Sequence, residues 1–180
     1  QFARAHPSKG MDSAPHHGGS ATLEYALGDC ALSIMSEALG QTANAAVLRR
    51  RGGNWRNVWD ASVADPESDF TGFPRPRMED GEWFTPPAGA YDPTSHYGFH
   101  EGTAWQYQWL VPQDVAGLTE AMGGRERMLA RLDRFFAFDK IAADPMSARA
   151  EWVAGPYAYY GQHRYNPNNE PTMHTPWIYT

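Results

Sequence analysis

The residues from Phe99 to Trp109 place one carboxylate, two glutamines and several large aromatic rings in one short stretch. If a helix begins near Gly102, Trp105 and Trp109 share one face, whose apolar rings with polar edges suit the CH patches and hydroxyls of a sugar. Indole rings that shield Glu101 from water would raise its pKa, so that it stays protonated and acts as a general acid. Spacing alone favours another interpretation, in which a glutamate at the helix start binds free backbone N–H groups beside core tryptophans.

A second polar segment, from Tyr165 to Pro171, holds three asparagines, one glutamate and two prolines. Amide and carboxylate oxygens on a stiffened loop are the hard ligands that Ca²⁺ prefers. The alternating acids of an EF-hand loop are absent. A turn is the alternative to a metal site, because asparagine tolerates left-handed backbone and Asn-Pro is a common turn signal.

Other patterns for metal or phosphate chemistry are weak or absent. His96 and His100 stand four residues apart, as zinc ligands on a helix do, but Gly98 and the loop-like composition around it argue against a helix there. The adjacent pair His16-His17 lies in a glycine-rich loop, where such pairs usually carry no metal. The sequence contains no phosphate-binding loop, dinucleotide fingerprint or GxSxG elbow. Phosphoryl transfer, hydride transfer and serine hydrolysis therefore lose their usual support.

Composition indicates one globular domain of 180 residues, of which 42% are hydrophobic and 13% aromatic. The net charge of −6 lacks the basic surface that binds nucleic acids or anionic membranes, so we expect neither partner. No run approaches the ~18 apolar residues of a membrane helix. The single cysteine, Cys30, excludes an intrachain disulfide framework and a zinc site of several thiolates.

Helical periodicity supplies the elements that must position these segments. Apolar residues recur at three- and four-residue steps from Leu23 through Ile34 to Ala38, so this stripe is expected to face the core. Helices are predicted at residues 21–39 with Ser20 as N-cap, 42–51, 114–122 and 125–138, and another begins at 174. The prolines of residues 60–99 leave room for at most one short β-hairpin, at Asp80-Gly81. The pattern predicts an all-α fold with long aromatic inter-helix loops.

Five runs of the sequence resemble, in order, glycoside hydrolase family 92. They are Ala21–Ala26, Phe73–Arg77, His100–Tyr107, Val111–Leu118 and Asn169–His174. That family consists of calcium-dependent, inverting exo-α-mannosidases. The resemblance implies that residues 20–180 are part of a helical catalytic domain, a fragment of an (α/α)6 toroid whose long loops build the site at one end. Residues 1–19 would be a loop that leads into it.

The resemblance also implies roles for individual residues. Glu101 falls on the general acid of the family, and Trp105 falls on an aromatic residue near the −1 sugar. The neighbours expected to contact the substrate are His100, Thr103 and Gln106. Asn169 and Glu170 fall on the loop associated with calcium. In this family the ion binds the 2- and 3-hydroxyls of mannose and helps to flatten the ring toward its transition state.

An inverting glycosidase needs a second carboxyl group about 6.5–9.5 Å from the acid, which activates water on the opposite face of the sugar. The resemblance implies that this base is an aspartate beyond Thr180, and that an N-terminal β-sandwich forms part of the +1 subsite. We therefore expect the catalytic domain to be incomplete in these residues. On their own, they are expected to show no mannosidase turnover.

Two departures from the family pattern bear on the substrate. Thr103 stands where most relatives have asparagine, and Pro167 with Asn168 stand where α-1,2-specific members tend to carry a His-Glu pair. An α-1,2 linkage is therefore disfavoured, while α-1,3, α-1,4, α-1,6 and mannosyl-phosphate linkages stay open. Glu101 argues against mannosyl phosphate, because phosphate is a good leaving group that needs no acid.

The leading interpretation is a secreted, periplasmic or cell-surface bacterial exo-α-mannosidase with Ca²⁺ as cofactor. Its partners would be a mannose-containing glycan and the rest of the same polypeptide. One alternative is a non-catalytic mannose-binding module, which would use the tryptophans and the calcium loop without a base. The others are a mannosyl-phosphodiester hydrolase and a helical structural domain with an aromatic core.

Overall fold

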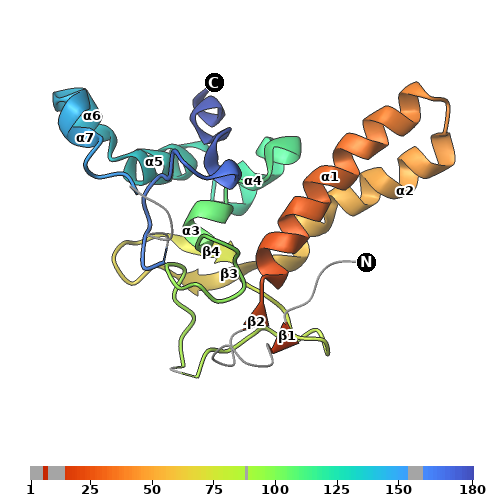
Figure 1. The fold of residues 1–180 in the computed structure, drawn as a ribbon, viewed down its shortest axis with the longest axis horizontal. Helices are drawn as coiled ribbons and strands as arrows, with labels where there is room; N and C mark the ends of the chain where they lie inside the picture. The colour runs from red at the N-terminus through yellow and green to blue at the C-terminus, as the bar shows by residue number, and fades with distance from the viewer. Residues whose placement is uncertain (1–5, 8–14, 88, 154–159) are drawn as a thin grey trace.

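Helices dominate the structure, a computed structural model that describes residues 6–7, 15–87, 89–153 and 160–180 (Figure 1). The α-helices are α1 (Gly18–Ala38), α2 (Thr42–Gly52), α3 (Ala104–Tyr107), α4 (Val115–Ala121), α5 (Arg125–Phe136), α6 (Phe138–Ala143) and α7 (Pro145–Ala148). The 3₁₀ helices are η1 (Gly53–Val58), η2 (Pro112–Asp114), η3 (Glu170–Thr172) and η4 (Thr175–Tyr179). The strands are β1 (His6–Pro7), β2 (Pro15–His16), β3 (Trp59–Ala64) and β4 (Thr71–Pro74). Within the described residues, no helix combines the length and the apolar character that crossing a membrane requires.

Helix α1 begins before the predicted N-cap Ser20, because a distant loop binds its first turn. The backbone N–H groups of Gly19 and Ser20 both donate to the carbonyl oxygen of Gly98, at 2.9 and 3.1 Å. A Cβ atom at Gly19 would lie 2.9 Å from the Phe99 ring, so glycine permits this close approach. The predicted loop of residues 1–19 is corrected accordingly, since its described part contains the short β1–β2 pair and the start of α1.

Helices α1 and α2 lie side by side as a hairpin that projects away from the rest of the chain (Figure 1). Gly40, with a φ of 71°, lies in the turn between them, in a conformation that glycine adopts without strain. Helix α2 confirms the prediction for residues 42–51 and continues into η1. Two buried residues of η1, Trp55 and Val58, return the chain to the core.

A small antiparallel sheet corrects the all-α prediction to a mostly helical fold. Strands β3 and β4 pair in the register Trp59↔Pro74, Asp60↔Phe73 and Ala64↔Thr71. The sequence concealed β3 because one aspartate and two alanines, residue types that are depleted in strands, make up half of its six residues. The expected hairpin at Asp80-Gly81 is present only as a single bridge between Arg77 and Trp83.

Helices α4 and α5 confirm their predictions. Asp114 caps α4, since its Oδ1 accepts the N–H of Gly117 at 3.0 Å. The pair Gly123-Gly124, both with positive φ, separates α4 from α5. Helix α5 ends earlier than predicted because Ala137 adopts a left-handed conformation, with a φ of 53°. The short helices α6 and α7 follow, and periodicity did not predict them.

Arg131 of α5 organises a core that is otherwise rich in aromatic side chains. The largest fully buried side chains are Trp55, Trp105, Trp109, Arg131, Tyr107, Phe73, Phe99 and Phe135. Arg131 donates to the carbonyl oxygens of Thr71 and Gly72 in β4, at 2.6 and 2.8 Å. It also donates to Gln108 Oε1 at 2.9 Å, and its guanidinium lies 4.5 Å from the centroid of the Phe73 ring. The buried cation therefore joins α5, β4 and the end of α3.

Candidate active site

A cavity of about 520 Å³ lies beside the first half of α1. Its other walls come from residues before, in and just after α3 and from the start of η3, which are distant in sequence. The lining residues are Glu24, Leu27, Gly28, His100, Glu101, Tyr107, Leu110, Asn169, Glu170 and Pro171. The structure thus brings together four predicted site residues, which are His100, Glu101, Asn169 and Glu170.

Glu101 has an unusual backbone conformation, with a φ of 49°. Among the residues that the structure describes, only Glu101 and Ala137 combine a side chain with a φ in the left-handed region. Such a conformation costs about 1–3 kcal/mol and is concentrated at functional sites. The carbonyl oxygen of Glu101 accepts a hydrogen bond from the side-chain amide of Asn169, at 2.6 Å. The residue predicted to be the acid and the loop predicted to bind calcium are therefore in direct contact.

The backbone of His100 is held on both sides. Its N–H donates to Ser20 Oγ at 3.2 Å, and its carbonyl oxygen lies 3.0 Å from the hydroxyl oxygen of Tyr107. On the other side of Glu101, a Cβ atom at Gly102 would lie only 2.9 Å from the Tyr107 ring. These contacts with α1 and α3 fix the segment from which Glu101 reaches the cavity.

The carboxyl group of Glu101 is open to a ligand. Its side chain is 40% exposed, and Oε1 lies 3.7 Å from His100 Nε2. The predicted shielding by indole rings is wrong, since Trp105 and Trp109 are fully buried and line other parts of the molecule. The helix expected to align them with Glu101 is only the four-residue α3, which begins at Ala104.

Three residues predicted to contact the substrate are buried and do not line the cavity: Thr103, Trp105 and Gln106. Thr103 caps α3 by accepting the N–H of Gln106 at 3.4 Å, and its hydroxyl donates to the carbonyl oxygen of Gln162 at 2.9 Å. Gln106 Nε2 donates to the carbonyl oxygen of Arg164 at 3.2 Å. These contacts hold the C-terminal loop, residues 160–169, against α3. A direct contact of the three residues with substrate stays a prediction.

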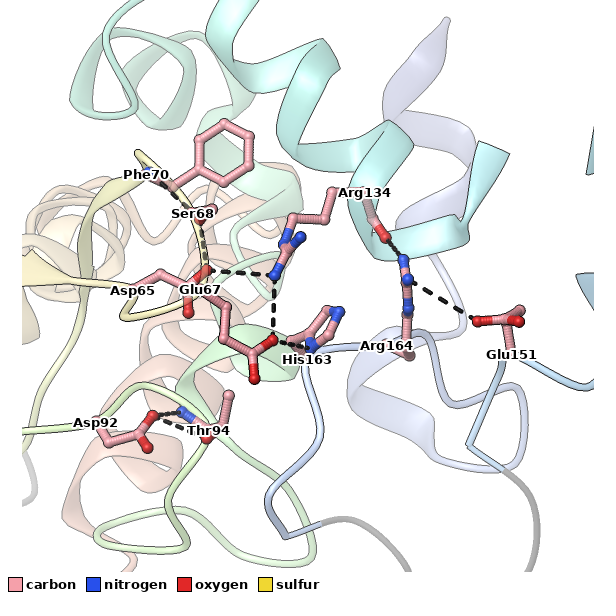
Figure 2. A network of polar contacts seen from close by, with 10 residues as sticks. All are labelled: Asp65, Glu67, Ser68, Phe70, Asp92, Thr94, Arg134, Glu151, His163 and Arg164. Atoms are coloured by element: carbon pink, nitrogen blue, oxygen red, sulfur yellow. Dashed lines mark hydrogen bonds and ion pairs between the residues drawn. The ribbon is translucent and has the colours of Figure 1, made fainter. Parts of the chain in front are cut away.

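A network of polar contacts around Arg134 and His163 involves residues that do not line the cavity (Figure 2). Arg134 of α5 forms ion pairs with Asp65 Oδ2 at 3.7 Å and with Glu67 Oε2 at 3.3 Å. His163 Nδ1 lies 3.8 Å from the same Glu67 oxygen, and the His163 and Trp105 ring centroids are 5.9 Å apart. The network therefore joins the β3–β4 loop, α5 and the C-terminal loop.

Side chains of the asparagine-rich loop stabilise the turn that precedes η3. Asn166 Oδ1 accepts the N–H of Asn168 at 3.0 Å. The hydroxyl of Thr172 lies within hydrogen-bond distance of the carbonyl oxygens of Asn166 and Asn169. The segment therefore contains a turn, although none of its asparagines has a left-handed backbone and the Asn169 side chain does not cap η3; the turn places Asn169 and Glu170 at the cavity.

The donor atoms at this turn fit part of a calcium site. The Glu170 carboxylate and the Asn169 amide oxygen are ligands of the kind that Ca²⁺ takes, although the ion requires about 6–8 oxygens. Within the described residues, no group of three or more His, Cys, Asp and Glu side chains is placed to hold a metal. The turn therefore offers an incomplete set of oxygen ligands.

The pair His96 and His100 has no common ligand position. The His96 ring packs against Tyr160, with centroids 5.3 Å apart, whereas the His100 ring packs against His17 at 4.6 Å. Gly98 between them has a φ of 86°, far from helical values. The weak zinc pattern in the sequence therefore does not correspond to two ligands on one helix face.

The sequence assigns no role to two residues of the cavity, Glu24 and Tyr107. The hydroxyl of Tyr107 donates to Glu24 Oε1 at 3.1 Å. Burial raises the pKa of Tyr107, and the neighbouring Glu24 carboxylate raises it further, so the hydroxyl stays a donor. The sequence did contain one signal for this face. Glu24, Leu27 and Gly28 are spaced to share one face of the predicted helix that contains the family motif Ala21–Ala26.

Glutamates from helix α1, from the segment before α3 and from η3 meet at this open cavity, and carboxyl groups are the groups that glycoside cleavage uses. The match to known proteins narrows this chemistry to one family. The chain belongs to glycosyl hydrolase family 92, because the model of the family's catalytic domain matches residues 4–180.

Solved structures of family members are similar to this chain. The family 92 inverting mannosidase of Bacteroides thetaiotaomicron VPI-5482 is 26% identical, with a TM-score of 0.61 over 89% of this chain and 20% of that one. A family 92 α-mannosidase of Bacteroides thetaiotaomicron in complex with mannoimidazole is 26% identical, with a TM-score of 0.62 over 92% and 20%. An uncharacterized secreted glycosidase of Arthroderma benhamiae is 28% identical over 131 residues, which are 63% of this chain and 16% of the relative. The chain thus spans a fifth or less of these proteins.

Proposed function

We propose that this chain is the segment of a family 92 catalytic domain that supplies the general acid of an exo-α-mannosidase. The observation that carries the proposal is Glu101, whose carboxyl group opens into the cavity from a left-handed backbone position that Asn169 holds. The family match and the mannosidases among the similar structures support a mannose-containing glycan as substrate.

In this proposal Glu101 protonates the glycosidic oxygen as its bond to the anomeric carbon breaks. The fixed backbone of His100 and Glu101 holds the carboxyl group in place before the substrate arrives, which reduces reorganisation at the transition state. An inverting reaction also requires a carboxylate base on the opposite face of the sugar. We assign that base to no residue of this chain.

We also propose Ca²⁺ as the cofactor, held in part by Asn169 and Glu170 and completed by oxygen atoms outside this chain. When bound, the ion would attract the hydroxyl oxygens of the sugar and strengthen those contacts as the ring distorts. Titration calorimetry with Ca²⁺ on the complete catalytic domain tests the assignment. The Glu170→Gln variant should bind the ion more weakly, and unchanged binding would contradict the role of Glu170.

The proposal extends to partners and location. Exposed apolar side chains on the α1–α2 hairpin, among them Ile34, Met35 and Leu39, fit a surface that further toroid helices of the same polypeptide cover. The secreted relative from Arthroderma benhamiae supports export from the cell. For a bacterial protein, export would place it in the periplasm, at the cell surface or in the medium.

The decisive experiment compares two leaving groups in the complete catalytic domain that contains this segment. Glu101→Gln removes the transferable proton with little change in size. We expect kcat/KM to fall about 10³-fold on a mannosyl disaccharide but less than about 10-fold on a dinitrophenyl mannoside, whose leaving group needs no proton. The control is Glu37→Gln, which affects an exposed glutamate of α1 that pairs with Arg49.

Equal losses on both leaving groups would contradict the acid role. Binding of mannose without turnover by the wild-type domain would favour a mannose-binding module instead. Cleavage of mannosyl phosphate, with Glu101→Gln fully active, would favour a mannosyl-phosphodiester hydrolase.

A further inference from the structure

The α1 wall of the cavity carries a carboxylate that the proposed acid step does not use. Glu24, Leu27 and Gly28 line the cavity from one face of α1, at positions i, i+3 and i+4. Glu24 is exposed, and nothing lies within 4 Å of the position that a Cβ atom of Gly28 would take. A ligand can therefore approach the α1 backbone between a carboxylate and an apolar side chain.

Tyr107 restrains this carboxylate. Its hydroxyl donates to Glu24 Oε1 at 3.1 Å and lies 3.0 Å from the carbonyl oxygen of His100. The Tyr107 residue is only 1% exposed, so its ring cannot turn freely and the hydroxyl has a fixed position. Through this one hydroxyl, the position of Glu24 is tied to the backbone that carries Glu101.

We infer that Glu24 accepts a hydrogen bond from a hydroxyl group of the sugar in the cavity, with Tyr107 as its positioning residue. A carboxylate offers about four acceptor sites and no donor, and Tyr107 occupies one of them. Sugar hydroxyls supply the matching donors, while Leu27 suits the CH patches of the ring. The inference rests on the proposed function, because it takes the occupant of the cavity to be a mannoside.

A metal role for Glu24 has less support than sugar binding. The described part of the chain has no cluster of three His, Cys, Asp or Glu side chains that would join Glu24 to Glu101 or Glu170 around an ion. The observation that favours a sugar hydroxyl is the hydrogen bond from Tyr107, which holds the Glu24 carboxylate beside the apolar side chain of Leu27 in the cavity lining.

Mannoimidazole binding to the complete catalytic domain provides the first test. Glu24→Gln should weaken binding about 10–100-fold, because a hydrogen bond to a charged group contributes about 1.5–3 kcal/mol. Tyr107→Phe keeps the carboxylate but removes its anchor, so we expect a loss of about 3–10-fold. Glu37→Gln, the same substitution farther along α1, should bind like the wild type.

A series of monodeoxy mannosides identifies the hydroxyl group. Removing the hydroxyl that Glu24 binds should lower kcat/KM about 10-fold or more for the wild type but hardly at all for Glu24→Gln. Because each variant is compared with itself, a loss of stability cannot imitate this coupling. Equal losses in both proteins for every deoxy position would overturn the inference.

Two further outcomes separate this inference from the proposed function. A wild-type domain that hydrolyses mannosides, with a Glu24→Gln variant that behaves like Glu37→Gln, would overturn only the role of Glu24. Rescue of a Glu24→Ala variant by azide would also overturn it, since azide replaces a carboxylate that activates water. A wild-type domain that neither binds nor cleaves mannosides would overturn the proposed function and this inference together.

Discussion

Apolar side chains are buried in the core around Arg131 but exposed on the outer half of the α1–α2 hairpin. In the core, Trp105, Trp109 and Phe135 are completely buried. On the hairpin, Ile34 of α1 is 64% exposed and Val47 of α2 is 46% exposed. Figure 1 shows the reason, since the hairpin projects from the remainder of the chain and α1 contacts the core only near its start.

This difference shows which surfaces the chain completes by itself. The core even holds the buried guanidinium of Arg131, whose two Nη atoms find acceptors although its buried Nε has none. The same helix α1 that builds one wall of the candidate site carries, farther along, apolar side chains that the described residues leave exposed. The candidate site is therefore supported by the packed core, whereas the exposed apolar face of the hairpin is available for contacts with other parts of a larger protein.

Arg131→Met, in the buried core, is expected to lower the free energy of unfolding more than any other change considered for the two regions. The substitution keeps much of the side-chain volume but leaves the carbonyl oxygens of Thr71 and Gly72 and the Oε1 atom of Gln108 without their donor. We expect the free energy of unfolding to fall by about 3–5 kcal/mol. Urea unfolding of the 180-residue chain measures this change.

Arg127→Met is the matched control for this prediction. Arg127 lies one turn earlier on α5, is 41% exposed and pairs with Asp69 at 3.3 Å. Its loss should cost no more than about 1 kcal/mol. If the two variants are equally stable, the buried cation does not hold the core together and the comparison fails.

The sequence predicted the helices better than the contacts between them. Asp114 and the Gly123-Gly124 pair were sufficient to place α4 and the start of α5, because these signals act locally. Strand β3 was missed because its stability comes from pairing with β4, which Arg131 binds, and not from its own residue preferences. Ile34 was wrongly expected to be buried, since periodicity shows which face is apolar but not what covers it.

The candidate site shows the same limit. The motifs singled out Glu101 and Asn169, which are 68 positions apart in sequence, and the structure joins them through one hydrogen bond. No local pattern indicates that Glu101 adopts a left-handed backbone or that Trp105 turns into the core. Glu24 was overlooked because an exposed charged residue on an amphipathic helix usually has no partner other than solvent, and only its hydrogen bond from Tyr107 and its place in the cavity lining distinguish it.

The polar network in Figure 2 is expected to make the stability of the chain depend on pH, with a smaller effect than that of Arg131→Met. Burial lowers the pKa of His163, and the charges of Arg164 and Arg134 lower it further, although Glu67 and Asp65 oppose them. The unfolded chain therefore binds a proton at His163 more readily than the folded chain does. Stability should be fully present above the ordinary histidine value of 6.5 and should fall as the pH drops through 6.5 toward the lowered pKa.

Urea unfolding between pH 7.5 and 5 tests this sign. His163→Asn should flatten the fall in stability toward acid, because the group that takes up the proton is gone. Arg164→Gln should flatten it in part, since removing that positive charge brings the pKa of His163 closer to its ordinary value. A fall in stability that is the same in all three proteins would show that the network does not couple stability to pH.

The smallest effect is expected on the hairpin, from the double substitution Ile34→Gln and Met35→Gln. Both side chains are more than half exposed, so the 180-residue chain should lose less than about 0.5 kcal/mol and should aggregate less. Leu23→Ala, on the same helix but at a buried position, should cost about 2–5 kcal/mol.

In the complete catalytic domain, however, the double substitution should become as costly as a core substitution, because other helices would then cover these side chains. A small loss in both proteins would mean that this apolar face stays exposed, and a large loss in both would mean that the hairpin already has a core of its own.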